Sequence, residues 1–268
     1  MQNVSRILVG IILIPIVITL IFFLPRAFFV FFMMVLTAGG LYEYFNLVKT
    51  DIVYSYGKIM FSAMGAMFPL SAFFWGSQGL FASLFVVLAV LMGLAMGRLT
   101  SFERSFSQVG GLFIGFFFIA TPLSMAVLIL SPSMAGREIA LWMVLVIWAG
   151  DTGAFYLGTT FGRHKLYPKI SPKKSVEGVV GGIVLSLLVG YLSSFFLKTG
   201  LSLKELVFLP FVLILLGQWG DFSESMLKRG ANVKDSGRIL GGHGGILDRI
   251  DSFLFTIPFF YYYLLLRC

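Results

Sequence analysis

The chain has 268 residues, of which 58% are hydrophobic and only 12% are charged, and its mean hydropathy is +0.95. This composition excludes a soluble globular domain and predicts an integral membrane protein. The net charge of +8 does not indicate nucleic-acid binding, because cytoplasmic loops of membrane proteins are rich in Lys and Arg and no segment resembles a nucleic-acid-binding module. Cys268 is the single cysteine, which excludes an internal disulfide bond.

A helix needs about 20 apolar residues to cross the hydrocarbon core of a bilayer, and nine segments approach that length. They predict an all-α polytopic membrane protein with about nine transmembrane helices, near residues 7–24, 27–45, 59–75, 80–96, 109–130, 139–157, 179–197, 206–221 and 252–266. The first segment could pass for a secretory signal, but no small-residue cleavage site follows it. We therefore interpret it as a retained span.

The distribution of basic residues predicts the orientation of these spans. With the N-terminus in the cytoplasm, fifteen of the twenty Lys and Arg residues lie in inner segments and five in outer ones. This positive-inside bias places the C-terminus outside and the two longest polar loops in the cytoplasm. The expected location is therefore the cytoplasmic membrane, with the active site open to the cytosol. Residues 1–108 are predicted to be a helical scaffold, and residues 109–268 to carry the catalytic site in those two loops.

Several acidic residues lie within or at the ends of apolar segments, where a charge without a partner is costly and usually marks function. They are Asp151, Asp221, Glu224, Asp248 and Asp251. The pairs 221/224 and 248/251 each have a spacing of three, which puts both carboxylates on one helix face. Such pairs could bind a divalent cation, since Mg²⁺ prefers carboxylate oxygens. Two other interpretations stay open: Asp151 in an ion pair that fixes helix packing, and acids that suit a helix N-terminus.

A glycine-rich run, GGHGGILDRID, precedes the last apolar segment. Glycines let backbone N–H groups approach an anion closely, and a loop that leads into a helix N-terminus points those donors at it. Five basic side chains nearby could neutralise phosphate charges: Lys228, Arg229, Lys234, Arg238 and Arg249. A glycine-rich loop alone could be a flexible connector, but together with the carboxylates it predicts a phosphate-binding site.

The other long cytoplasmic loop contains the sequence FGRHKLYPKISPKKSVEGVVGG. Lysines beside a membrane often act as topology anchors or contact anionic lipids. The serines beside Lys173 and Lys174 favour a more specific interaction with nucleotide phosphates. His164 is interpreted as a residue of the loop surface.

Residues 225–251 have the pattern Ser-Met-Leu-Lys-Arg, then Lys234-Asp235, Gly237, Leu240-Gly241, His243-Gly-Gly-Ile and Asp248-Arg-Ile-Asp. This pattern of about fifteen specified positions in 27 residues resembles the signature of the phosphatidate cytidylyltransferases, the CDP-diacylglycerol synthases. AGDTGAFYLG and ISPKKSVEGVVGG resemble two further blocks of that family. The chain has Gly241 where proline is common, a difference that removes no chemical group.

The resemblance implies transfer of a cytidylyl group from CTP to phosphatidic acid, giving CDP-diacylglycerol and pyrophosphate. It also implies a requirement for Mg²⁺ and allows a monovalent ion such as K⁺. The expected partners are CTP, phosphatidic acid and the lipid bilayer, with no nucleic acid. A homodimer through small-residue helix faces is left open.

The same residues receive expected roles. Asp221 and Asp248 are the expected principal metal ligands, supported by Glu224 and Asp251. The expected phosphate-binding side chains are Lys228, Arg229, Lys234 and Arg249, and those on the CTP side are Ser171, Lys173, Lys174 and Ser175. The expected triphosphate cradle is the backbone of Gly241, Gly242, Gly244 and Gly245. His243 would donate to a phosphate oxygen or to the leaving group, or stabilise the turn, and Asp151 would orient other groups or line the cavity.

Three other functions were weighed. A transporter of a phosphorylated solute or ion would also bury carboxylates near lysines. A CTP-dependent polyprenol kinase would share phosphate-binding loops. A CDP-alcohol phosphotransferase is disfavoured, because its pattern D-G-x2-A-R followed by G-x3-D-x3-D is absent from the sequence.

Overall fold

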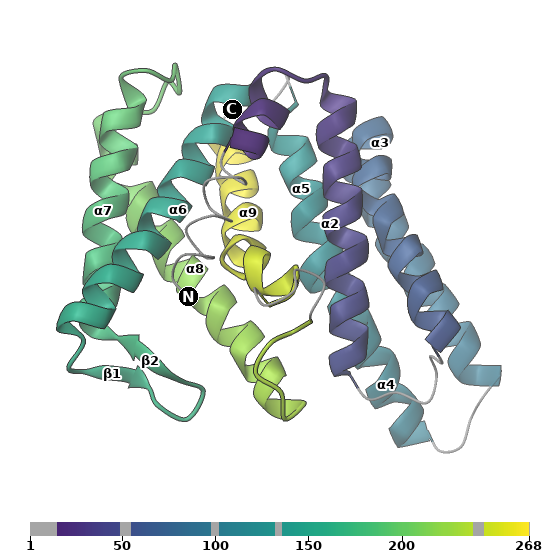
Figure 1. Cartoon of the computed structure of the whole chain (residues 1–268). Helices are drawn as coiled ribbons and strands as arrows, with labels where there is room; N and C mark the ends of the chain where they lie inside the picture. Colours follow the sequence, from purple (N-terminus) through teal and green to yellow (C-terminus); the bar gives the residue numbers. More distant parts are fainter. Residues whose placement is uncertain (1–14, 49–54, 98–101, 132–135, 238–243, 268) are drawn as a thin grey trace. The chain divides into compact units, whose positions relative to one another are not determined.

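The computed structural model describes residues 15–48, 55–97, 102–131, 136–237 and 244–267 (Figure 1). The predictions at Gly241, Gly242 and His243 lie outside these residues. The chain divides into two compact units. Unit 1 contains Met1–Ile14, Leu24–Leu128 and Asp235–Arg249, and unit 2 contains Pro15–Phe23, Ile129–Lys234 and Ile250–Cys268. The predicted division into residues 1–108 and 109–268 stays a prediction.

The helices agree with a polytopic membrane protein. In chain order the elements are α2 (Arg26–Leu47), α3 (Ser55–Gly97), α4 (Phe102–Gly115), the π-helix η1 (Phe116–Ala120), α5 (Thr121–Ile129), α6 (Gly136–Phe161), β1 (Lys165–Tyr167), β2 (Ser171–Ser175), α7 (Val176–Ser194), α8 (Leu203–Gly230) and α9 (Leu247–Arg267). Within the described ranges, six helical stretches are long and apolar enough to cross a membrane: α2, α3, the run α4–η1–α5, α6, α7 and α8. The protein is therefore an integral membrane protein.

The predicted spans can be matched to these helices. The third and fourth predicted spans both fall within α3, so the six stretches cover seven of the nine. The ninth predicted span is part of α9, which is not among the six. Of the first, residues 15–22 are helical and the earlier part lies outside the described residues.

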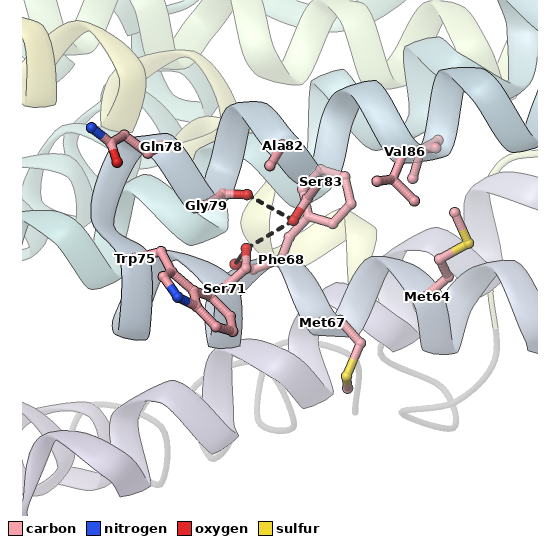
Figure 2. Close-up of a pocket in the computed structure, with 11 residues that line it drawn as sticks. Met64, Met67, Phe68, Ser71, Trp75, Gln78, Gly79, Ala82, Ser83 and Val86 are labelled. Carbon is pink, nitrogen blue, oxygen red and sulfur yellow. Dashed lines mark hydrogen bonds between the residues drawn. The ribbon is translucent and has the colours of Figure 1, made fainter.

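In unit 1, α3 is a helical hairpin and not one straight rod. Gly76 adopts φ 61° and ψ −146°, which breaks the helix in a conformation that favours glycine. The hydroxyl groups of Ser71 and Ser83 are hydrogen-bonded at 2.9 Å, as Figure 2 shows. Twelve residues of straight helix would separate them by about 18 Å. The two helices predicted on either side of residues 76–79 are therefore confirmed as helices, and the prediction that each crosses the membrane stays a prediction.

Aromatic side chains form much of the core of unit 1. Phe116 contacts the rings of Phe45, Phe61 and Phe68, with centroids 5.6 to 6.2 Å apart. The Tyr44 hydroxyl donates a hydrogen bond of 2.7 Å to the carbonyl of Gly111. These contacts join α2, α3, α4 and η1, and they fix the end of α2 within unit 1.

In unit 2, glycines let three helices approach each other closely. A Cβ atom on Gly153 of α6 would collide with the carbonyl of Gly181 on α7, and one on Gly150 would collide with Ile214 of α8. The indole N–H of Trp142 donates to the carbonyl of Gly190 at 2.8 Å. Lipid provides no hydrophobic force between helices, so such close backbone contact supplies the packing energy.

Between α6 and α7 the chain forms a short antiparallel hairpin of β1 and β2 (Figure 1). Lys165 pairs with Ser175 and Tyr167 pairs with Ser171. This hairpin is the one departure from the all-α prediction within the described parts of the chain. The sequence ISPKKS gave no strand signal, because proline, serine and lysine are poor strand formers.

Candidate active site

An ion pair joins the β-hairpin to α8 in unit 2. The ammonium of Lys174, on β2, lies 2.8 Å from Oδ2 of Asp221. It also lies 4.1 Å from the centre of the Phe222 ring and donates to the carbonyl of Gln218 at 3.4 Å. The side chain of Lys174 is 14% exposed and that of Asp221 is 34% exposed, so the pair is partly open to its surroundings. The structure thus brings together one predicted CTP-side lysine and one predicted metal ligand.

Two further carboxylates lie beside this pair. The Ser252 hydroxyl, on α9, donates to Oδ1 of Asp151 on α6 at 3.3 Å, and the Ser252 backbone N–H donates to Oδ1 of Asp251 at 2.8 Å. The charge of Asp221 acts on both aspartates, and so does that of Lys174. Asp151, Lys174, Asp221 and Asp251 are called the aspartate cluster below.

Glycines on α8 explain why α9 comes so close. A Cβ atom on Gly220 would collide with the backbone carbonyl of Asp251, and one on Gly217 would lie 3.6 Å from Ser252. Glycine at position 220 allows the two backbones to touch, whereas a Cβ at position 217 would make an ordinary contact. The residue after Gly220 is Asp221, so the same contact brings Asp221 beside Asp251.

The oxygen atoms of the aspartate cluster fit a divalent cation. Its three aspartates could supply carboxylate oxygens to a hard cation, and the ammonium of Lys174 lies beside one of them. Over the described ranges, no group of three or more His, Cys, Asp or Glu side chains is arranged to hold a metal ion unaided. Mg²⁺ usually binds through one or two carboxylates and takes water and phosphate oxygens for the rest.

The structure pairs two other predicted site residues with each other. Oε2 of Glu224 lies 2.5 Å from the ammonium of Lys228, one helical turn along α8. Both side chains are buried, with exposures of 1% and 11%. The expected roles of Glu224 at a metal ion and of Lys228 at a phosphate stay predictions.

The residues expected on the CTP side lie on or next to β2. Lys173 is exposed and Ser171 is partly exposed. Ser175 is buried and caps α7, because its hydroxyl oxygen accepts a hydrogen bond from the Gly178 N–H at 3.2 Å. Cap residues of this type stabilise a helix start by about 1 kcal/mol. Ser175 therefore has a structural role that its sequence position had not indicated.

The hairpin is attached to α7 and α8 by side-chain contacts. His164 is 81% exposed, as predicted for a loop surface, but its Nδ1 lies 2.6 Å from the Glu177 carboxylate, which also accepts the His164 N–H. Arg229 donates to the carbonyls of Ile170 and Val233, at 3.5 and 3.1 Å. Lys234 is exposed. These contacts hold the hairpin that carries Lys173 and Lys174.

In unit 1, Asp248 organises the glycine-rich loop. Its Oδ2 accepts hydrogen bonds from the backbone N–H groups of Ser236 and Gly245, at 3.0 and 2.8 Å, and lies 2.9 Å from the Ser236 hydroxyl. Gly244 has φ +81°, which favours glycine. The N–H of Gly245 therefore donates to Asp248, a carboxylate of the protein itself. Of the proposed triphosphate cradle, Gly244 is the other glycine that lies within the described residues. Arg249 is exposed.

Sequence reasoning missed Glu43, which contacts the same loop. Glu43 lies on α2 and is only 2% exposed. Its carboxylate accepts the N–H groups of Ile246 and Leu247 at 3.0 and 2.9 Å. A signal was present, because Glu43 is the sole acidic residue in the α2 sequence, just as Asp151 interrupts an apolar segment.

The α3 hairpin carries a groove of about 470 Å³ that offers none of this chemistry (Figure 2). Its lining includes Met64, Met67, Phe68, Trp75 and Val86, with Ser71, Ser83 and Gln78 as its polar members. None of its lining residues is titratable. The catalytic candidates therefore lie in the polar clusters and not in this groove.

The chain is similar to known cytidylyltransferases over most of its length. The model of the cytidylyltransferase family matches residues 4–267. The phosphatidate cytidylyltransferase of Staphylococcus haemolyticus is 38% identical over 209 residues, which cover 74% of this chain and 76% of the relative. The enzyme of Bacillus subtilis is 36% identical over 200 residues, which cover 75% of this chain and 74% of the relative. The enzyme of Staphylococcus saprophyticus is 50% identical over 123 residues, which cover 46% of this chain and 47% of the relative. The chain belongs to the cytidylyltransferase family.

Proposed function

We propose that this chain is a phosphatidate cytidylyltransferase, which makes CDP-diacylglycerol and pyrophosphate from CTP and phosphatidic acid. The family match and the relatives support this function, and so does the membrane-spanning character of the chain. The structural observation that carries it is the aspartate cluster, where a lysine from the β-hairpin meets carboxylates of three helices. Phosphoryl transfer between anions needs this combination of cationic groups and metal-binding oxygens.

The reaction joins two anions. An oxygen of the lipid phosphate attacks the α-phosphorus of CTP, and the bond between that phosphorus and the bridging oxygen to the β-phosphate breaks. The bonding electrons leave with pyrophosphate. The attacking oxygen already carries negative charge at neutral pH, so a strong general base is not required. The protein must instead hold the two anions in line and stabilise the charge on the leaving group.

The residues of this chain would divide these tasks. Lys173 and Lys174 would bind phosphates of CTP, since an ammonium supplies a compact positive charge. The side chains that would bind further phosphate oxygens are Lys228, Arg229, Lys234 and Arg249. Ser171 and the backbone near Gly244 would donate hydrogen bonds. Asp151 would orient Ser252 and, through it, the start of α9.

Mg²⁺ would be held by carboxylates of this chain. We retain Asp221 and Asp248 as the proposed principal ligands and Glu224 as support. The contact of α8 with α9 favours Asp251 as a close neighbour of Asp221. When bound, Mg²⁺ would neutralise charge on the phosphates and the leaving pyrophosphate. K⁺ is a further proposed ion without an assigned ligand.

The proposed location is the cytoplasmic membrane, with nine spans, the N-terminus in the cytoplasm and the C-terminus outside. Phosphatidic acid presents its headgroup at the inner leaflet and CTP is cytosolic, so the site must be open to both. The basic β-hairpin fits a cytoplasmic position by the positive-inside rule.

Purified protein in phosphatidic acid liposomes tests this function. With CTP labelled on the α-phosphate, the lipid product should become labelled, and with CTP labelled on the γ-phosphate the label should appear in pyrophosphate. Transfer of γ-label to a lipid would identify a kinase. Counterflow of a phosphorylated solute without CTP turnover would identify a transporter.

A further inference from the structure

Glu43 is a buried carboxylate at the end of α2 that the proposed mechanism does not use. Burial of a charged group is costly unless hydrogen bonds compensate for the lost water. Glu43 has such compensation from one short segment: Ile246 N–H donates to Oε1, and Leu247 N–H donates to Oε2. The Ser236 hydroxyl lies 3.0 Å from Oε2.

These N–H groups stand at the start of α9. The first N–H groups of a helix have no partner within the helix, and they carry its partial positive charge. A nearby serine, threonine or aspartate usually accepts them. Here a glutamate more than 200 positions earlier in the chain does so. Glu43 therefore fixes the backbone at the point where the glycine-rich loop becomes helix.

Glycines of the same loop pack directly on this carboxylate. A Cβ atom on Gly237 would collide with Oε1 of Glu43, and one on Gly245 would collide with Oε2 and with the Ser236 hydroxyl. On α2, a Cβ atom on Gly39 would collide with the side chain of Ile246. Residues before and after positions 238–243, namely Gly237 and Gly245, thus both pack against Glu43.

Glu43 is also linked to a proposed metal ligand. The Ser236 hydroxyl lies 3.0 Å from Oε2 of Glu43 and 2.9 Å from Oδ2 of Asp248. One hydroxyl hydrogen can serve only one of these oxygens at a time, so the two carboxylates share a donor. The backbone N–H groups of Ser236 and Gly245 donate to the same Oδ2 of Asp248. A shift of Glu43 would therefore move Ser236 and, with it, Asp248.

We infer that Glu43 is a positioning residue for the segment that leads into α9: it fixes the start of this helix at Ile246 and Leu247 and, through Ser236, the orientation of Asp248. This inference rests on the proposed function, because the loop matters only if it serves the transfer reaction. Glu43 would not touch either substrate.

Glu43→Gln tests the inference, because it keeps the size of the side chain and replaces one accepting oxygen by a donor. We expect the amides of residues 245–248 to exchange hydrogen faster in the substrate-free variant, while those of α3 are unchanged. We also expect kcat to fall about 10- to 100-fold, as is typical when a partner that orients a metal ligand is removed. Glu103→Gln, at an exposed acid in the first turn of α4, is the matched control and should leave both measurements unchanged.

Each outcome decides the inference. Wild-type kcat in Glu43→Gln, or lost activity with unchanged exchange at residues 245–248, would overturn it. If Glu43→Gln does not fold, Ser236→Ala removes only the shared hydroxyl and should give faster exchange in the same segment with a lower kcat; wild-type behaviour of Ser236→Ala would then overturn it. If wild-type protein makes no CDP-diacylglycerol, the proposed function fails, whereas the exchange difference still reports whether Glu43 fixes the loop.

Discussion

The ammonium of Lys174 lies 2.8 Å from a carboxylate oxygen of Asp221, which connects the β-hairpin before α7 to the middle of α8. Lys174 thereby supplies a positive charge at the carboxylates proposed to hold Mg²⁺. The triphosphate of CTP would bring negative charge to the same place. The lysine and a metal ion can then both neutralise the negative charge of phosphate oxygens. We therefore expect CTP binding to depend on the lysines of β2 and turnover to depend on a divalent cation.

Lys173→Ala should raise the KM for CTP more than the KM for phosphatidic acid. Lys173 is exposed on β2, next to Lys174, where its charge can reach nucleotide phosphates. Steady-state kinetics with each substrate varied in turn measures the two constants. An equal change in both would favour a role as a membrane anchor.

Removal of divalent cations with EDTA should abolish CDP-diacylglycerol formation, and added Mg²⁺ should restore it. The aspartate cluster brings together three aspartates whose oxygens suit a hard divalent cation. In Asp221→Asn, half-maximal activity should require a higher Mg²⁺ concentration. Full turnover of the wild-type protein in EDTA would contradict a metal-dependent mechanism.

Asp248→Asn should reduce turnover by about 100-fold or more, while the protein still inserts into the membrane and purifies. One oxygen of Asp248 has two backbone donors and the Ser236 hydroxyl around it, and the amide group of Asn lacks the charge that favours these contacts. Labelled CTP measures the turnover. Glu138→Gln, in the first turn of α6, serves as the control, and robust activity of Asp248→Asn would disprove the assignment.

Glu177→Gln should raise the KM for CTP about twofold to fivefold and leave kcat nearly unchanged, because exposed ion pairs are weak. Glu177 accepts hydrogen bonds from the His164 ring and backbone, which attach the start of the β-hairpin to α7. Loss of this attachment would let Lys173 and Lys174 occupy more positions. His164→Ala should reproduce the effect, and a change in kcat alone would argue against it.

Gly153→Ala should destabilise the protein by about 1–3 kcal/mol, the usual cost of overfilling a packed interface. Its Cβ would collide with the Gly181 carbonyl and lie 2.9 Å from Cβ of Leu185. Thermal unfolding in detergent measures the change. The control is Gly93→Ala on α3, where a Cβ would meet nothing within 4 Å; it should keep the wild-type stability or slightly exceed it.

The sequence by itself determined the class of protein and the positions of most helices. A bilayer requires long apolar segments, and this requirement is local, so it can be read from composition within a window of about 20 residues. The gap between the predicted spans 59–75 and 80–96, for example, contains the break at Gly76. The cost of charge in lipid likewise marked Asp151 and Asp221 as candidate functional residues before any contact was known.

Only the tertiary structure decided which of these charges meet. Asp221 and Glu224 share a face of α8, yet one pairs with Lys174 and the other with Lys228. Glu43 caps the start of α9 although more than 200 residues separate them in the chain. The physical reason is that periodicity fixes the face of a helix, whereas the partner of that face depends on how closely backbones approach. In this protein that approach is set by glycines such as Gly220, which packs against Asp251, and Gly245, which packs against Glu43. These partners are distant in the sequence, so no local pattern indicates them.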